Sequence, residues 1–324
     1  MNKDSKLKKF RNIIFQMNEI GLIIIVVLLG IVIYLINHDF LSAENIIGIL
    51  RNSVFYFIIG CGLTFVLIAG ELDISVGSIV GFSGLIAAIL LQKGIPVVFS
   101  IIIGIFCGLL IGYINSFIIG RLKVPPLIAT LGTLYIFRGL INVITKGKTI
   151  SNLPESFKAI AQGKLFNIPY LIFYAVIIGI ISHLVLNYTK YGYNVRSVGG
   201  NKEAARVVGI NVRLIQISVY LISGFICALS GILMTSRLSV GSPNVGNGLE
   251  LYIVSLVIIG GTSLFGGIGS ILGTLFGAIF MGTVQNGMLM VHIDPFWQNV
   301  VIGTIMILAV AIDQYRRGKM WTVV

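Results

Sequence analysis

Two carboxylates, Glu71 and Asp73, lie two positions apart between long apolar segments. An ionised carboxylate that faces lipid is costly, so both side chains should face a protein interior, a polar cavity or the inner membrane interface. Glycines at both ends of residues 70–77, GELDISVG, are typical of a helix that is interrupted inside a membrane. We expect Glu71, Asp73 and Ser75 either to shape a translocation pathway at such an interruption or to form an ordinary cytosolic turn with solvated charges.

Other polar side chains also interrupt the apolar segments. Arg138 would either snorkel to the outer interface or pair with a buried acid along a pathway. Amide side chains inside a membrane more often join helices, and tryptophan more often anchors at the interface, so a pathway role is their less common use. These amides and this tryptophan are Asn115, Gln285, Asn286 and Trp297.

Motifs for catalysis or metal binding are missing from the sequence. The cysteines lie singly in apolar segments and the histidines are scattered, without a CxxC, HExxH or GxSxG motif. Gly147, Lys148 and Thr149 imitate the end of a phosphate-binding P-loop, but Asn142 stands where that motif requires glycine. We therefore expect this chain to have no enzyme activity, no metal site and no cofactor of its own.

The composition is that of a membrane protein. Of 324 residues, 56% are hydrophobic and 10% are charged, with a mean hydropathy of +1.01, so the charge is too sparse to cover a water-soluble domain. Uncharged segments of roughly 20 residues, the length of a membrane-spanning helix, recur along the chain. Residues 251–291 carry no charge and are too long for one helix, so they should hold two. The ten expected spans are residues 20–36, 52–70, 74–91, 95–120, 124–145, 169–188, 214–236, two within 251–291, and 295–312.

The positions of lysine and arginine predict the orientation of these spans. The net charge of +12 comes mostly from short loops between apolar segments, which indicates membrane topology and not nucleic-acid binding. An excess of cations inside places both termini in the cytoplasm, although the expected outer loop 146–164 carries four lysines and argues against this. The chain then divides into a cytoplasmic segment 1–19, a transmembrane domain 20–312 with a cytoplasmic loop at 188–213, and a cytoplasmic tail 313–324.

The predicted cytoplasmic loop should contain a short helix. Asn201 is a suitable N-cap, Glu203 would lie in the first turn, and Gly209 would end the helix. Such a helix would either dock on a partner protein or lie on the membrane surface.

A second glycine-rich junction, at residues 260–267, is similar to the first. Both junctions lead into similar sequences, GSIVG at 77–81 and GSILG at 269–273. Transporters often build their pathways from repeats with interrupted helices, but a match this short also arises by chance. An internal repeat and a coincidence are both open.

Several motifs in the same order resemble the permease subunits of ribose-type ABC importers. Residues 70–77 look like their GGIDLSVG-type signature, with Glu71 where the ribose pattern usually has glycine. The other matching segments lie at residues 128–139, 199–211, 248–251 and 260–267, so the resemblance covers about residues 50–312. Residues 123–138 and the region of Pro154 are also similar to the autoinducer-2 and rhamnose branches, so ribose is one candidate among several.

The resemblance implies an all-α integral membrane protein of about ten transmembrane helices with Gly-rich breaks, in the bacterial cytoplasmic (inner) membrane. It implies a permease that carries a small sugar, either ribose, a related monosaccharide or an autoinducer-2-like sugar. The implied partners are a second permease subunit, in a homodimer or a heterodimer, an extracytoplasmic sugar-binding protein, membrane lipid, and a cytosolic ABC ATPase that binds ATP and Mg²⁺.

The resemblance also implies roles for particular residues. Thr130 and Glu250 lie in the matching motifs and join the candidate pathway residues. The segment that would dock on the ATPase contains Asn201, Glu203, Ala204, Ala205, Arg206 and Gly209.

The intramembrane acids also allow a transporter of a different class. In a secondary carrier, Glu71 and Asp73 would bind the coupling H⁺ or Na⁺. A membrane scaffold, which only the helix-packing glycines would support, is a third alternative.

Overall fold

The computed structural model describes residues 18–166, 168–294 and 296–321, and nearly all of their regular structure is helical. The first half comprises α2 (Asn18–Ile36), the 3₁₀ helix η1 (His38–Leu41), α3 (Ala43–Ile68), α4 (Val76–Gln92), α5 (Val97–Leu122) and α6 (Pro126–Thr145). The second half comprises α7 (Glu155–Gln162), α8 (Tyr170–Tyr188), α9 (Lys190–Gly200), α10 (Lys202–Val207), α11 (Val212–Leu238), α12 (Leu249–Ile259), α13 (Ile271–Met290) and α14 (Phe296–Trp321). Between α7 and α8, β1 (Lys164–Leu165) pairs antiparallel with β2 (Ile168–Pro169).

Each predicted apolar segment contains a helix, but the helices differ in length. Helices α3, α5, α6, α8, α11 and α13, six in the described part of the chain, are long and apolar enough to cross a membrane. Four shorter apolar helices occupy Gly21–Ile36, Val76–Gln92, Leu249–Ile259 and Phe296–Ala311. Helix α12 has 11 residues and therefore rises about 17 Å, roughly half of a hydrocarbon core. Residues 251–291 thus hold one long and one short helix, and not two full-length spans.

Both glycine-rich junctions are breaks between helices, as the sequence predicted. Residues 69–75 separate α3 from α4, and residues 260–270 separate α12 from α13. At each break a glycine has a positive φ, 72° at Gly70 and 90° at Gly261, which side chains with a Cβ rarely adopt. The next amide bonds back five residues, from Glu71 to Val66 and from Thr262 to Val257, each at 3.1 Å. This pattern is a Schellman cap, which explains why both helices end where they do.

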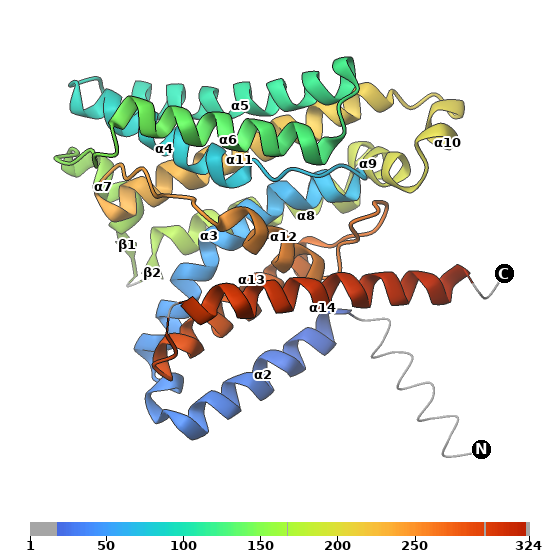
Figure 1. The fold of residues 1–324 in the computed structure, drawn as a ribbon. Helices are drawn as coiled ribbons and strands as arrows, with labels where there is room; N and C mark the ends of the chain where they lie inside the picture. Colours follow the sequence, from blue (N-terminus) through green and yellow to red (C-terminus); the bar gives the residue numbers. More distant parts are fainter. Residues whose placement is uncertain (1–17, 167, 295, 322–324) are drawn as a thin grey trace.

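Helix α11 lies at the centre of the bundle and packs against α3, α4 and α5 (Figure 1). Glycines allow these backbones to approach closely, because a Cβ on Gly224 would collide with Gly108 and one on Gly231 would collide with Val80. Helix α6 packs on α4 and α5, while α13 packs on α3 and α2, and α14 on α12. The result is a layered helical bundle in whose centre the backbone of α11 packs directly against those of α4 and α5.

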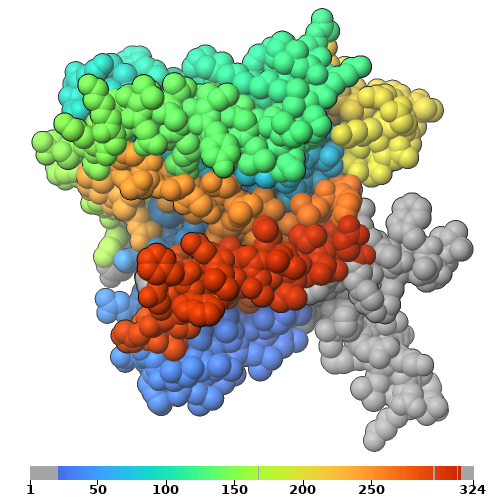
Figure 2. Space-filling model, in the orientation of Figure 1, coloured from blue at the N-terminus to red at the C-terminus, as the bar shows by residue number. Residues whose placement is uncertain are grey.

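The two ends of the bundle differ. Helix α7 and the β1–β2 hairpin lie at one end, and α9 and α10 lie at the opposite end (Figure 1). Along the bundle, large apolar side chains are exposed on α2, α5, α6 and α8, as contact with lipid or with another membrane subunit requires. Figure 2 shows α6 and α14 on one such face, with parts of the α11–α12 region visible between them.

Candidate functional site

The carboxylate of Asp73 is fully buried in the break between α3 and α4. Its Oδ1 accepts hydrogen bonds from the backbone nitrogen of Ser75 at 2.9 Å and from the Ser75 hydroxyl at 2.5 Å. Its Oδ2 accepts a hydrogen bond from the Ser223 hydroxyl, on α11, at 3.0 Å. The carboxylate also lies at the N-terminus of α4, where the helix dipole favours negative charge. Asp73 therefore fixes the start of α4 against α11.

The hydrogen bonds of Asp73 continue into two further helices. The side-chain nitrogen of Asn115, on α5, donates to the Ser75 hydroxyl at 2.8 Å. The hydroxyl of Thr133, on α6, donates to the Asn115 side-chain oxygen at 2.7 Å. We call the buried residues Asp73, Ser75, Asn115, Thr133 and Ser223 the Asp73 network. It joins the α3–α4 break to α5, α6 and α11, and it positions the break within the bundle.

Glu71 contacts a different part of the molecule from Asp73. Its Oε1 accepts a hydrogen bond from the ammonium group of Lys202, the first residue of α10, at 2.7 Å. The Glu71 side chain is 2% exposed and that of Lys202 is 43% exposed. The two acids are thus not a shared acidic site, and neither is a solvated charge in an ordinary turn. No sequence pattern indicates that Glu71 pairs with a residue 131 positions away.

A second polar group lies where α4, α6 and the start of α12 meet. The Arg138 guanidinium donates from Nη1 to the backbone oxygen of Val245 at 2.8 Å. A Cβ placed on Gly77 would meet both the Glu250 carboxylate and the Arg138 guanidinium, so these two side chains converge on α4. Among the described residues, Nε and Nη2 of Arg138 and Oε2 of Glu250 have no hydrogen-bond partner. We call this pair of side chains the Arg138–Glu250 site; its donors and acceptor without partners are buried inside the bundle.

Three predicted pathway residues lie away from both groups, and the fourth, Thr130, meets the Asp73 network only through its backbone carbonyl, to which the Thr133 hydroxyl also donates at 3.1 Å. The Thr130 hydroxyl donates to the Pro126 carbonyl within its own helix, at 2.8 Å. Gln285 accepts a hydrogen bond from the Tyr56 hydroxyl at 2.7 Å, and Asn286 exchanges hydrogen bonds with Asn45 at 2.8 and 3.0 Å. These two amides join α13 to α3, which is the common use of amides inside membranes. Trp297 is 59% exposed near the start of α14, as an interfacial anchor would be.

The predicted short helix is α10, which begins after the cap that the sequence indicated. The Asn201 side-chain oxygen accepts hydrogen bonds from the backbone nitrogens of Glu203 and Ala204, both at 3.0 Å. Glu203 and Arg206 form an exposed ion pair, Ala205 is 2% exposed, and Gly209 has a φ of 83°. We call residues 201–209 the coupling segment.

The coupling segment also presents two apolar side chains that sequence reasoning missed. Val207 and Val208 are 88% and 73% exposed at the end of the bundle that carries α9 and α10. Exposed valines beside an ion pair are suited to contact with another protein. The available signal was the position of both valines at the end of a short helix that carries the charged residues Lys202, Glu203 and Arg206.

Comparison with known proteins decides the family. Residues 45–310 match the permease family described as "Branched-chain amino acid transport system / permease component". The chain belongs to this permease family.

Individual relatives cover almost the whole permease. It is 35% identical over 322 residues to the ribose import permease protein of Haemophilus influenzae, with 98% of each chain covered. It is 35% identical over 302 residues to the L-arabinose ABC transporter permease protein of Azospirillum brasilense, with 93% of this chain and 89% of that one covered. It is 33% identical over 318 residues to the galactose/methyl galactoside import permease protein of Escherichia coli, with 92% and 94% covered. No solved structure gives a significant match.

Family membership establishes the class of this permease. It is a multi-pass protein of the bacterial cytoplasmic membrane, and it is not an enzyme, because a separate ATPase subunit hydrolyses ATP in such importers. The resemblance to ribose-type permeases is thereby confirmed. The ion-coupled carrier is set aside, and the burial and separate contacts of Glu71 and Asp73 give it no support. Within the described residues, no group of three or more His, Cys, Asp or Glu side chains could hold a metal ion.

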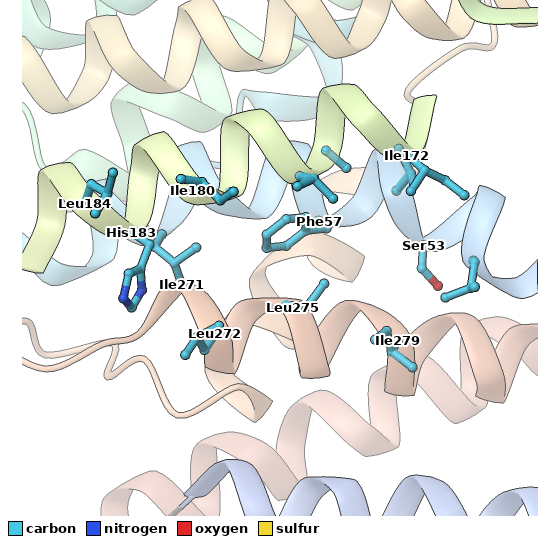
Figure 3. A pocket seen from close by; sticks show the side chains of 15 residues that line it. Ser53, Phe57, Ile172, Ile180, His183, Leu184, Ile271, Leu272, Leu275 and Ile279 are labelled. Carbon is cyan, nitrogen blue, oxygen red and sulfur yellow. The ribbon is translucent and has the colours of Figure 1, made fainter. Parts of the chain in front are cut away.

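The permease also has an apolar groove of about 350 Å³ between α3, α8 and α13 (Figure 3). Figure 3 shows Phe57 between Ile180 of α8 and Leu275 of α13, with Ser53 towards one end and His183 towards the other. Nearly all of the lining is aliphatic or aromatic. A polar solute needs hydrogen-bonding groups along its path, so this groove is not a candidate pathway.

Proposed function

We propose that this permease moves a small sugar into the cell as the membrane subunit of an ATP-driven importer. The single observation that carries the proposal is its 35% identity, over 93–98% of its length, to permeases named for ribose and L-arabinose. Other relatives are named for galactose/methyl galactoside and D-allose, each 33–34% identical. The substrate is therefore a monosaccharide of this group, and ribose is one candidate.

The proposed complex has three further components. A second permease subunit completes the pathway, an extracytoplasmic binding protein delivers the sugar, and a cytosolic ABC ATPase binds ATP with Mg²⁺. The coupling segment supports the ATPase contact, because Val207 and Val208 are exposed beside the Glu203–Arg206 ion pair. A docking role of Asn201, Glu203, Ala204, Ala205, Arg206 and Gly209 is part of this proposal.

The proposed topology has ten membrane crossings with α9 and α10 in the cytoplasm. The six long and four shorter apolar helices lie in these crossings, and residues 239–248 would complete the crossing for which α12 alone is too short. Arg121 lies in the last turn of α5 and Lys123 directly after it, and Arg213 lies in the first turn of α11, so cations gather at the proposed cytoplasmic side. Both termini would then be cytoplasmic; residues 1–17 and 322–324, on which this prediction falls, lie outside the described residues.

The Arg138–Glu250 site is the proposed contact for sugar hydroxyls. A guanidinium donates and a carboxylate accepts, and both have unused capacity in this structure. The Asp73 network is fully engaged in internal hydrogen bonds, so its proposed role is to shape the helix break and not to touch the sugar.

Uptake by the complete transporter tests this function. The permease would be purified from its bacterial host with its copurifying subunits and reconstituted in liposomes with the binding protein. Labelled ribose, L-arabinose, galactose and allose would then be supplied with and without ATP. ATP-dependent uptake of at least one sugar is expected. Uptake that survives without ATP, or a complex without an ATPase subunit, would contradict the proposal.

A further inference from the structure

Five glycines bring the end of α9 into backbone contact with both helix breaks. We call Gly70, Gly199, Gly200, Gly266 and Gly267 the glycine junction. The backbone nitrogen of Gly267 donates to the carbonyl of Ile68, the last residue of α3, at 2.8 Å. A Cβ on Gly199 would collide with that same carbonyl, and a Cβ on Gly266 would collide with Gly199 and Gly70. The end of α9 is therefore held between the α3–α4 break and the α12–α13 break.

Arg196 adds a side-chain tie between α9 and the second break. Its Nη1 donates to the Gly269 carbonyl at 3.1 Å, and its Nη2 donates to the Asn187 side-chain oxygen at 2.8 Å. Partial burial lowers the pKa of the Arg196 guanidinium, although such a group stays charged. One residue separates the end of α9 from the start of α10. The contacts that hold the end of α9 against both breaks therefore also hold the start of the coupling segment near them.

The ion pair between Glu71 and Lys202 ties the coupling segment itself to the first break. Glu71 is almost fully buried, and Lys202 reaches it from the half-exposed first position of α10. The second carboxylate oxygen of Glu71 is buried without a hydrogen-bond partner among the described residues. A buried carboxylate that loses its cation is strongly unfavourable, so displacement of α10 without movement of the break is resisted.

We infer that Glu71 and Lys202 are positioning residues that make the α3–α4 break follow the coupling segment when the ATPase moves it. The inference rests on the proposed function. The glycine junction keeps the backbone of α9 in close contact with both breaks. The ion pair adds a direct charged link between α10 and Glu71, which lies two positions before Asp73.

The test compares coupling in reconstituted complexes with Lys202→Gln, Glu71→Gln, the double variant and Lys202→Arg. The measured quantity is sugar transported per ATP hydrolysed, alongside thermal stability and the amount of copurified ATPase. We expect Lys202→Gln to lower this ratio about fivefold or more while the ATPase stays bound. The double variant should recover thermal stability relative to Lys202→Gln, because it leaves no unpaired buried carboxylate, but its ratio should stay lowered, because the charged link is absent. Lys202→Arg should restore most of the ratio.

Lys158→Gln is the matched control, since it removes an ion pair of similar length, 2.6 Å, between the exposed Glu155 and the partly buried Lys158 at the other end of the bundle. It should leave the ratio unchanged. Wild-type ratios in all Lys202 and Glu71 variants would overturn the inference, as would a loss of stability with an unchanged ratio. A wild-type complex without ATP-dependent uptake would instead contradict the proposed function, so the two failures are distinguishable.

Discussion

The hydroxyl oxygen of Ser223 lies 3.0 Å from the Oδ2 atom of Asp73, although 150 residues separate them in the sequence. Ser223 belongs to α11, the central helix, and Asp73 to the break before α4. The contact therefore places the first helix break against the centre of the bundle. The other oxygen of the same carboxylate accepts a hydrogen bond from the Ser75 hydroxyl. Ser75 in turn accepts one from Asn115 of α5, which accepts one from Thr133 of α6.

Asp73→Ala should destabilise the permease and impair transport strongly. The substitution leaves three buried donors, two from Ser75 and one from Ser223, without their acceptor. Each unsatisfied donor costs about 1–3 kcal/mol, so we expect the free energy of unfolding to fall by about 3 kcal/mol or more. Thermal unfolding in detergent and uptake measure the two effects. Glu155→Ala, at an exposed acid, is the control; equal behaviour of the two variants would refute a structural role for Asp73.

Glu250→Gln should weaken sugar transport while the complex still assembles. The amide keeps the shape of the side chain but loses the charge that attracts hydroxyl donors, which we expect to raise the KM for uptake about tenfold. Initial rates at several sugar concentrations would show the change, with ATPase copurification unaltered. Glu44→Gln changes an exposed acid in the first turn of another helix, α3, and should have no effect. An unchanged KM for Glu250→Gln would remove this residue from the pathway.

Val207→Asp should weaken attachment of the ATPase. Val207 is 88% exposed, and a carboxylate placed in an apolar contact loses solvation without gaining a partner. We expect copurified ATPase to fall about tenfold, for a loss of about 1.4 kcal/mol of binding. Phe166→Asp, at an 87% exposed position at the opposite end of the bundle, should leave the amount unchanged. Equal recovery of ATPase with both variants would contradict docking at the coupling segment.

Gly199→Ala should be far more damaging than Gly200→Ala. A methyl group on Gly199 would collide with the backbone of Ile68 and of Gly267, whereas a Cβ on the adjacent Gly200 meets nothing within 4 Å. Overpacking of this kind costs about 1–3 kcal/mol, and here it also pushes α9 away from both breaks. Thermal unfolding and transport would be compared for the two variants. A harmless Gly199→Ala would show that the junction is not closely packed.

The sequence predicted three of the five residues that form the Asp73 network, Asp73, Ser75 and Asn115. Asp73 and Asn115 were recognisable because a carboxylate or amide inside an apolar segment needs partners. Thr133 and Ser223 were not, since serine and threonine hydroxyls in helices commonly bond to their own backbone and give no sign of a long-range partner. Thr130, which does bond to its own helix, shows how alike the two cases are in sequence.

Helix positions were predicted well and helix lengths less well. Positively charged loops and glycines marked the ends of most apolar segments, and both breaks were found at their glycines. The extent of α12 could not be predicted, because no charged residue marks a boundary anywhere within residues 251–291. The pairing of Glu71 with Lys202 depends on how α9 folds back on the breaks, which local sequence does not specify.

The shortness of α12 sets the depth at which a solute would meet Glu250. This residue lies in the first turn of α12, about 15 Å along the helix from the break at Gly260. In the proposed orientation that break faces the cytoplasm, and a hydrocarbon core of about 30 Å leaves a similar distance on the outer side. A sugar held there would be equidistant from both compartments, so small, opposite movements of the flanking helices would suffice to expose it to one side or the other.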